Sequence, residues 1–193
     1  MMERPLQQLT SIYLFPAFNL SALTLYSSGS AATSWSILPS GGLKSLQTFM
    51  FNLTAPGTNP SRQDAPHPHE VILDPTGSFI VVPDLGADLV RVFSVDPKTS
   101  LLTETNPFLA PAGSGPRHGT FLKADSGKTF FFLISELANT IASYEVEYSA
   151  TGLNFTKVFL SGIYGNRTTP DGAAAAEAIL SVSRFPLNPL KVY

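Results

Sequence analysis

The chain has 193 residues, of which 44% are hydrophobic and only 13% are charged, and its formal net charge is −2. A weakly acidic chain gives no electrostatic reason to expect nucleic acid as a partner. Cysteine is absent, which excludes disulfides, a thiolate nucleophile and a cysteine-ligated metal. No apolar stretch is long enough to cross a bilayer as a helix, so no membrane partner is expected.

Residues 1–25 are the hardest part of the chain to interpret. An apolar run is broken there by Pro16 and Asn19. This pattern fits a poor signal peptide, a strand pair from an upstream repeat or sequence foreign to the fold. We expect the degraded edge of an upstream repeat, and we divide the chain into a poorly defined segment, 1–25, and one structural domain, 26–193.

The next segments read as strands followed by a long loop. Residues 26–49 are predicted to form two strands around the turn Pro-Ser-Gly-Gly at 39–42. Residues 52–65, NLTAPGTNPSRQDA, form a polar loop rich in Pro, Asn and Gly. A loop of this length inside a compact domain is usually functional or disordered.

Three short strands are predicted within residues 66–95, with the sequences HEVIL, SFIVVP and LVRVFSV. The turn Asp74-Pro75-Thr76-Gly77 joins the first two, since Pro fixes φ and Gly accepts a positive φ. Connections this short cannot join parallel neighbours, so the sheet must be antiparallel. Residues 101–103 add an outer strand, and residues 106–115 lead the chain away from it.

The same pattern of strands and turns returns about 50 residues further along the chain. Gly127 follows Gly77 by 50 residues, Tyr144 follows Phe93 by 51, and residues 30–43 align without gaps on residues 88–101. A period near 50 residues with about four strands is typical of a β-propeller blade. We therefore predict an all-β fold, a partial and open β-propeller of about three to three and a half blades. A single antiparallel sandwich is the alternative.

Two further strands and an ambiguous end complete the prediction. Residues 130–134 form a continuous apolar run, which indicates a central strand covered on both faces. Residues 156–160 are the expected outer strand. Residues 173–177 favour a helix by propensity, but the repeat predicts the first strand of a fourth blade at 177–182, and we follow the repeat. The chain would then stop in mid-blade.

Blade geometry brings polar residues to one face of the disc. The first strand of a blade begins, and the second ends, on the same face, because each strand reverses direction. His69 and Asp84 occupy these two positions in one blade, and Arg117, His118 and Glu136 occupy them in the next. Converging His, Arg and Glu side chains suit an acid/base site for an anionic substrate.

The motifs PHPHEVILDPTG, VPDLGAD, GSGPRHG and SELANT, in this order, resemble the lactonase family of seven-bladed β-propellers. That family includes bacterial-type 6-phosphogluconolactonase and the fungal carboxy-muconate cyclase. The resemblance implies an enzyme that opens or closes a lactone, on a small anionic lactone or carboxylate, without a cofactor.

The same resemblance implies roles for individual residues. His69, Arg117 and Glu136 match the family's proposed site positions. Arg117 would hold a carboxylate or phosphate, while His69, near its useful pKa without adjustment, or Glu136 would move the proton. We add a set of substrate-binding residues: His67, Asp84, His118 and Glu177.

This chain departs from the family pattern in length and in one motif. Family members close seven blades, and the Ser-Asn-Arg expected shortly after Ala175-Ala176-Glu177 is absent, which removes a second arginine. A non-catalytic binding module and an inactive truncation product therefore stand as alternatives. Open blade edges, especially residues 130–133, would favour self-association.

Structural readings also exist for the candidate residues. His67 and His69 point to one side of an extended segment and could ligate a metal, but no third ligand is evident, so no metal site is predicted. Arg117 and Glu136 could form a purely structural ion pair, and Asp84 could be a turn residue.

The location of the protein is predicted from weak signals. The lack of cysteine fits the cytoplasm, which is the expected location. Secretion is the alternative, and only there would the four glycosylation sequons at Asn19, Asn52, Asn154 and Asn166 matter.

Overall fold

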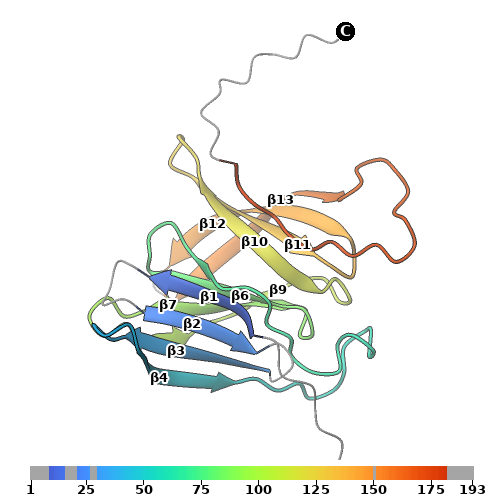
Figure 1. The fold of residues 1–193 in the computed structure, drawn as a ribbon. Coiled ribbons are helices and arrows are strands. Elements are labelled where there is room, and N and C mark those ends of the chain that lie inside the picture. Colours follow the sequence, from blue (N-terminus) through green and yellow to red (C-terminus); the bar gives the residue numbers. More distant parts are fainter. Residues whose placement is uncertain (1–8, 16–20, 27–29, 150, 182–193) are drawn as a thin grey trace, which may run out of the picture.

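Three antiparallel sheets that follow one another along the chain make up the fold (Figure 1). The computed structural model describes residues 9–15, 21–26, 30–149 and 151–181. Every regular element in these ranges is a strand, and they contain no helix that could span a membrane. Three sheets rather than two exclude the sandwich alternative and agree with the predicted blades.

The first sheet contains β1 (Leu9–Phe15), β2 (Ser21–Tyr26), β3 (Ala31–Ile37) and β4 (Leu43–Met50), in that order. The expected edge of an upstream repeat is thus wrong for β1 and β2, because both strands lie in the same sheet as β3 and β4. The break at Pro16 and Asn19 falls between the two strands, outside the described residues. The boundary at residue 25 stays a prediction, although it falls inside β2, which pairs with β3.

The second sheet contains β5 (Ile72–Leu73), β6 (Phe79–Asp84), β7 (Leu89–Val95) and β8 (Leu102–Glu104). β5 is shorter than predicted, although a separate bridge joins Pro68 to Asp84 upstream of it. β9 (Phe108–Leu109), which the sequence did not indicate, pairs with β7. The Asp74 carboxylate accepts hydrogen bonds from the backbone N–H of Thr76 and of Phe79, which closes the predicted turn.

The third sheet contains β10 (Pro116–Lys123), β11 (Thr129–Ser135), β12 (Thr140–Ser149) and β13 (Gly152–Gly162). β13 includes the expected outer strand. The expected exposure of residues 130–133 is wrong, because β11 lies between β10 and β12 and Phe131 and Leu133 are buried.

Backbone geometry confirms that the three sheets repeat. The residue before the third strand of each sheet has a φ of 51°, an unusual value for a residue other than glycine. These residues are Ser30, Asp88 and Asn139, so the gapless alignment of residues 30–43 on 88–101 is correct in three dimensions.

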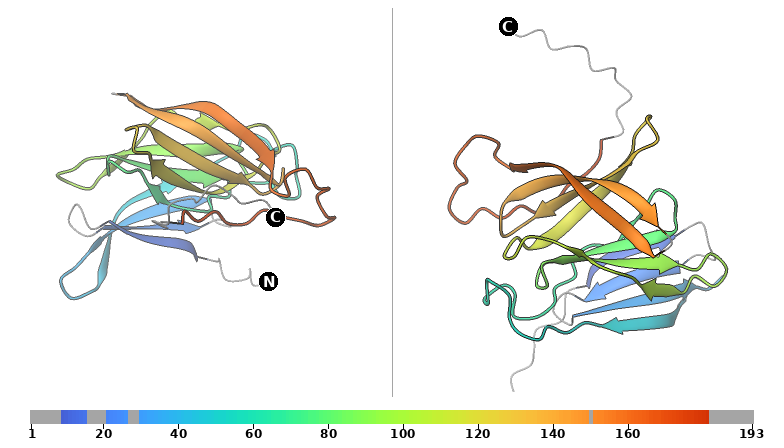
Figure 2. Two further views of the ribbon diagram at one scale, coloured as in Figure 1. Left: turned by 90° about the horizontal axis from the view of Figure 1, so that it is seen from above. Right: turned by 180° about the vertical axis from the view of Figure 1, so that it is seen from behind.

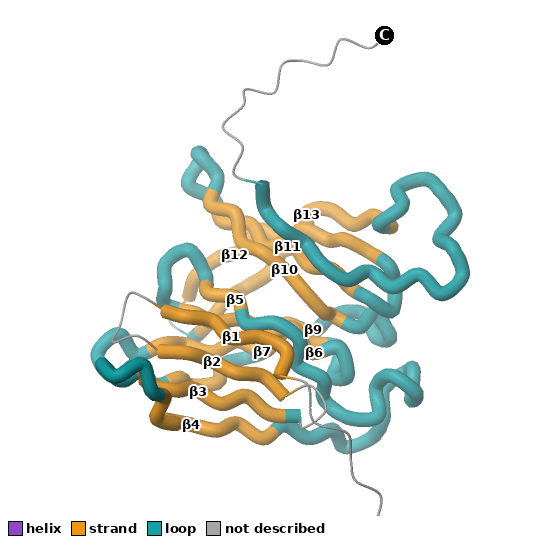
Figure 3. The backbone as a smooth tube through the Cα atoms, in the orientation of Figure 1, coloured by secondary structure: helices purple, strands orange, loops and turns teal. Residues whose placement is uncertain are grey.

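The predicted strand of a fourth blade is absent over its described part, residues 177–181. Residues 163–181 form turns and coil that run back beside β10 (Figure 3). A strand needs a neighbour to satisfy its backbone groups, and the described chain supplies none there. The Asn139 side chain instead donates to the carbonyl of Ala173.

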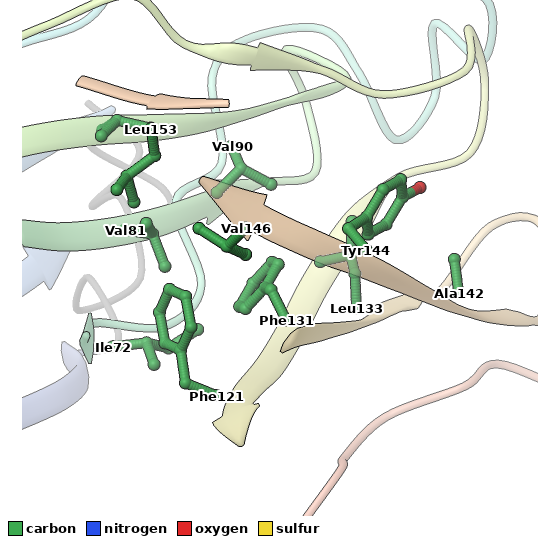
Figure 4. Close-up of a cluster of buried hydrophobic side chains, with 11 residues drawn as sticks. Ile72, Val81, Val90, Phe121, Phe131, Leu133, Ala142, Tyr144, Val146 and Leu153 are labelled. Atoms are coloured by element: carbon green, nitrogen blue, oxygen red, sulfur yellow. The ribbon is translucent and has the colours of Figure 1, made fainter. Parts of the chain in front are cut away.

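Two apolar cores hold the sheets together face to face. In β6, Val81 joins the core against the third sheet (Figure 4). Ile80 and Val82 join the core against the first sheet. Alternate side chains of a strand point to opposite faces, so a strand between two sheets must be apolar on both. This explains the run of Phe79 to Val82. Figure 2 shows the three sheets layered on one another in chain order.

Candidate active site

The three residues predicted to form the site come from two neighbouring sheets. His69 lies just before β5, where its backbone N–H donates to the carbonyl of Pro83 at 3.0 Å. Arg117 is the second residue of β10. Glu136 follows β11 directly, and its N–H donates to the carbonyl of Gly115 at 2.8 Å. The charges of Arg117 and Glu136 both act on the His69 ring, so the three residues lie together as predicted.

Glu136 lies between two arginines. Arg117 donates from Nη1 to Oε2 at 2.6 Å, and Arg62 donates from Nη2 to Oε1. The Glu136 side chain is only 4% exposed. Burial acts to raise the pKa of this carboxyl, but the hydrogen bond from Arg62 and the charges of both arginines outweigh it and hold the pKa below its usual value. Glu136 is therefore ionised at neutral pH.

His69 is neutral at the same pH. Burial, helped by the positive charge of Arg117, lowers the pKa of its ring to about 4. The expectation that this histidine needs no adjustment is thus wrong for the protein without a ligand. An anion bound at Arg117 would offset the charge of that arginine and raise the pKa of His69 again.

Arg117 keeps an unused donor. Its Nε atom is buried and has no hydrogen-bond partner within the described part of the chain. A buried N–H without an acceptor is costly, and hydrogen bonds between guanidinium and an oxyanion are among the strong ones. The donor therefore favours an anionic ligand at this place.

Arg62 is the residue of this group that the sequence analysis did not select. It lies in the long polar loop, residues 52–65, and is the only cationic residue there. The one available signal was the length of the loop, which marked it as functional or disordered. Its contact with Glu136 spans 74 residues of sequence, which no local spacing can predict.

A second polar group lies beside the first. His118 Nδ1 and Glu177 Oε2 are 2.7 Å apart, and the His118 ring centroid is 6.5 Å from that of His69. Glu70, also missed by the sequence analysis although it follows His69 directly, accepts from the N–H of Gly119 at 2.7 Å. Burial raises the pKa of Glu70 to about 7, which the Gly119 hydrogen bond opposes and nearby Glu177 supports.

This second group borders a pocket of about 370 Å³. The pocket is lined by residues 70, 72, 119, 120 and 177–180. The donor atoms of Glu70, His118 and Glu177 all lie within 4.8 Å of one another, a set able to hold a divalent cation. The metal alternative in the sequence analysis used His67 and His69 instead, and neither belongs to this set.

Two predicted substrate-binding residues have other partners. Asp84 is fully buried, and its carboxylate accepts from the Arg91 guanidinium at 2.8 and 3.0 Å and from the N–H of His67 and Ala87. All its acceptor capacity is used inside the fold, so the turn reading is right and substrate binding is not supported. The His67 ring contacts Asp64, with 3.0 Å between Nε2 and Oδ1.

Comparison with known proteins identifies the family of this chain. Residues 20–185 match the family described as "Lactonase, 7-bladed beta-propeller". The chain belongs to this lactonase family. A protein named "Probable 6-phosphogluconolactonase" from Arthroderma benhamiae is 37% identical over 175 residues, covering 90% of this chain and 43% of that protein. The 6-phosphogluconolactonase of Bacillus subtilis is 26% identical over 73% of this chain and 39% of its own length.

Solved structures show the same fold. A protein from Lactobacillus plantarum superposes with a TM-score of 0.63 at 29% identity, over 77% of this chain and 41% of that one. The periplasmic gluconolactonase PpgL of Pseudomonas aeruginosa superposes with a TM-score of 0.67 at 23% identity, over 84% and 44%. This lactonase-family chain thus spans less than half the length of the relatives it matches.

Proposed function

We propose that this chain acts on a small anionic sugar lactone of the 6-phosphogluconolactone type and hydrolyses it. The observation that carries the proposal is the meeting of a neutral His69, an ionised Glu136 and Arg117 with its buried unpaired donor. The names of the curated relatives support the same substrate class. Because this chain covers less than half of each of those relatives, the activity is proposed for this chain.

Each residue has a role in the proposed reaction. Arg117 binds the anionic group of the substrate, and this offsets the positive charge that, after burial, lowers the pKa of His69. His69 then takes a proton from water as the water oxygen attacks the lactone carbonyl carbon. The bond between this carbon and the ring oxygen breaks, His69 returns the proton to the ring oxygen, and the product is an open-chain hydroxy acid. Glu136 holds Arg117 in place.

Three alternatives are kept as outcomes of the test. Cyclisation of a carboxy-muconate would use the same arginine and histidine in the reverse sense, but the relatives above are named for lactone hydrolysis. A non-catalytic module would bind the anion without turnover, and an inactive product would do neither. A cytoplasmic location is retained as a proposal and is tested by cell fractionation.

The variants His69→Ala and Arg117→Ala test the proposal. Each is expected to lower kcat/KM for 6-phosphogluconolactone by about 10²–10⁴-fold, because general-base catalysis and the substrate anchor are lost. Arg167→Ala is the matched control, since Arg167 is exposed in the coil after β13. Circular dichroism checks that all variants fold. Equal activity in the wild type and both site variants would overturn the proposal.

A further inference from the structure

We infer that Arg62, held over the site by the loop of residues 52–65, forms a two-arginine clamp with Arg117 that recognises a phosphoryl group on the substrate. This inference rests on the proposed function and names the residue that selects phosphorylated over neutral sugar lactones.

The loop is built to hold Arg62 in one place. The neighbouring Gln63 is fully buried and donates from Nε2 to the carbonyl of Leu85 at 2.9 Å. Its Oε1 accepts from the N–H of Asn59 at 2.9 Å, and its backbone carbonyl accepts from Gly57 at 2.8 Å. A buried side-chain amide with these partners fixes the backbone at residue 63, and so the starting point of the Arg62 side chain.

Charge at the clamp favours an anion. Arg62 and Arg117 contact different oxygens of the single Glu136 carboxylate, so two positive charges face one negative charge. The His69 ring adds no charge at neutral pH. One excess positive charge beside a half-buried site attracts an anionic group.

The two arginines also keep hydrogen-bond donors for a ligand. Arg62 uses Nη2 on Glu136 and its side chain is 48% exposed, while Arg117 has the buried unpaired Nε. A phosphoryl group offers several acceptor oxygens and can bridge two planar guanidinium groups, which a neutral hydroxyl cannot do. A carboxylate shares part of this chemistry and is distinguished by the experiment.

Calorimetric titration of the purified chain with 6-phosphogluconate and with gluconate tests the clamp. The two ligands carry the same carboxylate and differ only in the phosphoryl group. Arg62→Gln is expected to weaken binding of 6-phosphogluconate about tenfold or more and to leave gluconate unchanged. Arg62→Lys, which keeps the charge but not the planar fork, should restore part of the loss. Arg167→Gln is the matched control and should change neither affinity.

Gln63→Ala adds a readout that a merely structural role would not give. Gln63→Ala should weaken the binding of 6-phosphogluconate as much as Arg62→Gln does. The double variant should show no further loss of affinity, because both changes remove the same contact. If Arg62→Gln weakens the binding of both ligands equally, Arg62 contacts the carboxylate that they share, and the inference is overturned. An unchanged affinity for 6-phosphogluconate, or no binding by the wild type, would overturn it as well.

Failure of the clamp and failure of the proposed function can be told apart. If Arg62→Gln and the wild type hydrolyse 6-phosphogluconolactone with the same KM, the proposed function holds and the clamp is overturned. If binding of 6-phosphogluconate depends on Arg62 but the chain hydrolyses no lactone, the clamp holds and the proposed function is overturned. The chain would then be a non-catalytic binding module.

Discussion

Glu136 is a single carboxylate that two guanidinium groups share, and this sharing sets the charge of the candidate site. Because Glu136 is buried, removing either arginine would leave it with less compensation. Its role is therefore to order Arg62 and Arg117, and its lowered pKa makes it a weak base. In the proposed reaction the proton transfer falls to His69, because its pKa would rise when an anion binds at Arg117.

Glu70 is a second residue with a measurable consequence. Its pKa in the folded protein is raised from 4.5 to about 7, so the folded state binds the proton more tightly than the unfolded state. Glu70 therefore reduces stability progressively as pH rises from about 4.5 to about 7, and the penalty is constant above that.

Glu70→Gln should remove this penalty. Relative to wild type, the free energy of unfolding of the variant is expected to rise by about 1–2 kcal/mol between pH 4.5 and pH 8, a value reduced for the partial exposure of Glu70. Urea denaturation of both proteins at the two pH values measures it, with exposed Glu147→Gln as the control. A stability difference between Glu70→Gln and wild type that does not depend on pH would contradict the assignment.

The sequence predicted some site residues and could not predict others, for a physical reason. His69, Arg117 and Glu136 occupy equivalent ends of repeated strands, so the repeat alone places them together. Arg62 lies in an irregular loop whose path depends on the buried Gln63 side chain, and no periodicity describes such a path. Asp84 also lies at a strand end on the same face, but its carboxylate is paired with Arg91. Sequence spacing does not reveal this partner.

At the scale of elements, the loop of residues 52–65 passes very close to the turn after β6. A Cβ atom on Gly86 would lie 1.8 Å from the carbonyl oxygen of Ala65, a distance that backbone atoms cannot tolerate. Glycine at this position allows the loop to reach the site. The close approach links the turn to the placement of Arg62.

Gly86→Ala is therefore expected to displace the loop and to destabilise the fold by about 2–4 kcal/mol, the range for severe overpacking. Gly42→Ala is the matched control, because the nearest atom to its Cβ would be Ser40 Oγ at 3.4 Å. Chemical denaturation and limited proteolysis near Arg62 measure the two effects. Wild-type stability and unchanged cleavage in Gly86→Ala would show that the approach is looser than described.

Strand prediction succeeded where a strand has neighbours and failed where it has none. The apolar runs of β6 and β11 are covered on both sides and formed as expected. The pattern at residues 177–181 resembles the start of a blade, but a first strand needs a second strand to pair with. Glu177 bonds to His118 instead and holds the coil beside β10.

For the whole molecule, the repeat predicted the number of blades, whereas the membership of β1 and β2 in the first sheet required the structure. The two cores show why successive blades adhere, since each buries apolar side chains against the next. In the described chain, β13 is the edge strand of the third sheet and has apolar side chains exposed on both sides. Val158, Phe159 and Leu160 of β13 are each more than half exposed.

We expect these apolar residues of β13, rather than residues 130–133, to drive self-association. Phe159→Lys should raise the dimer dissociation constant at least about tenfold, because it removes a phenyl group from an apolar contact and adds a charge. Sedimentation velocity over a range of concentrations measures it, with exposed Asn154→Lys as the control on the same strand. A wild-type chain that stays monomeric at every concentration would refute this expectation.

The central claim is that the site formed by His69, Arg117 and Glu136 opens a phosphorylated sugar lactone. Its most direct test is the initial rate of acid release from 6-phosphogluconolactone by the purified 193-residue chain, corrected for spontaneous hydrolysis. The account predicts saturable turnover that His69→Ala abolishes. A rate equal to spontaneous hydrolysis, from a folded chain that binds 6-phosphogluconate, would contradict it and leave a binding module in its place.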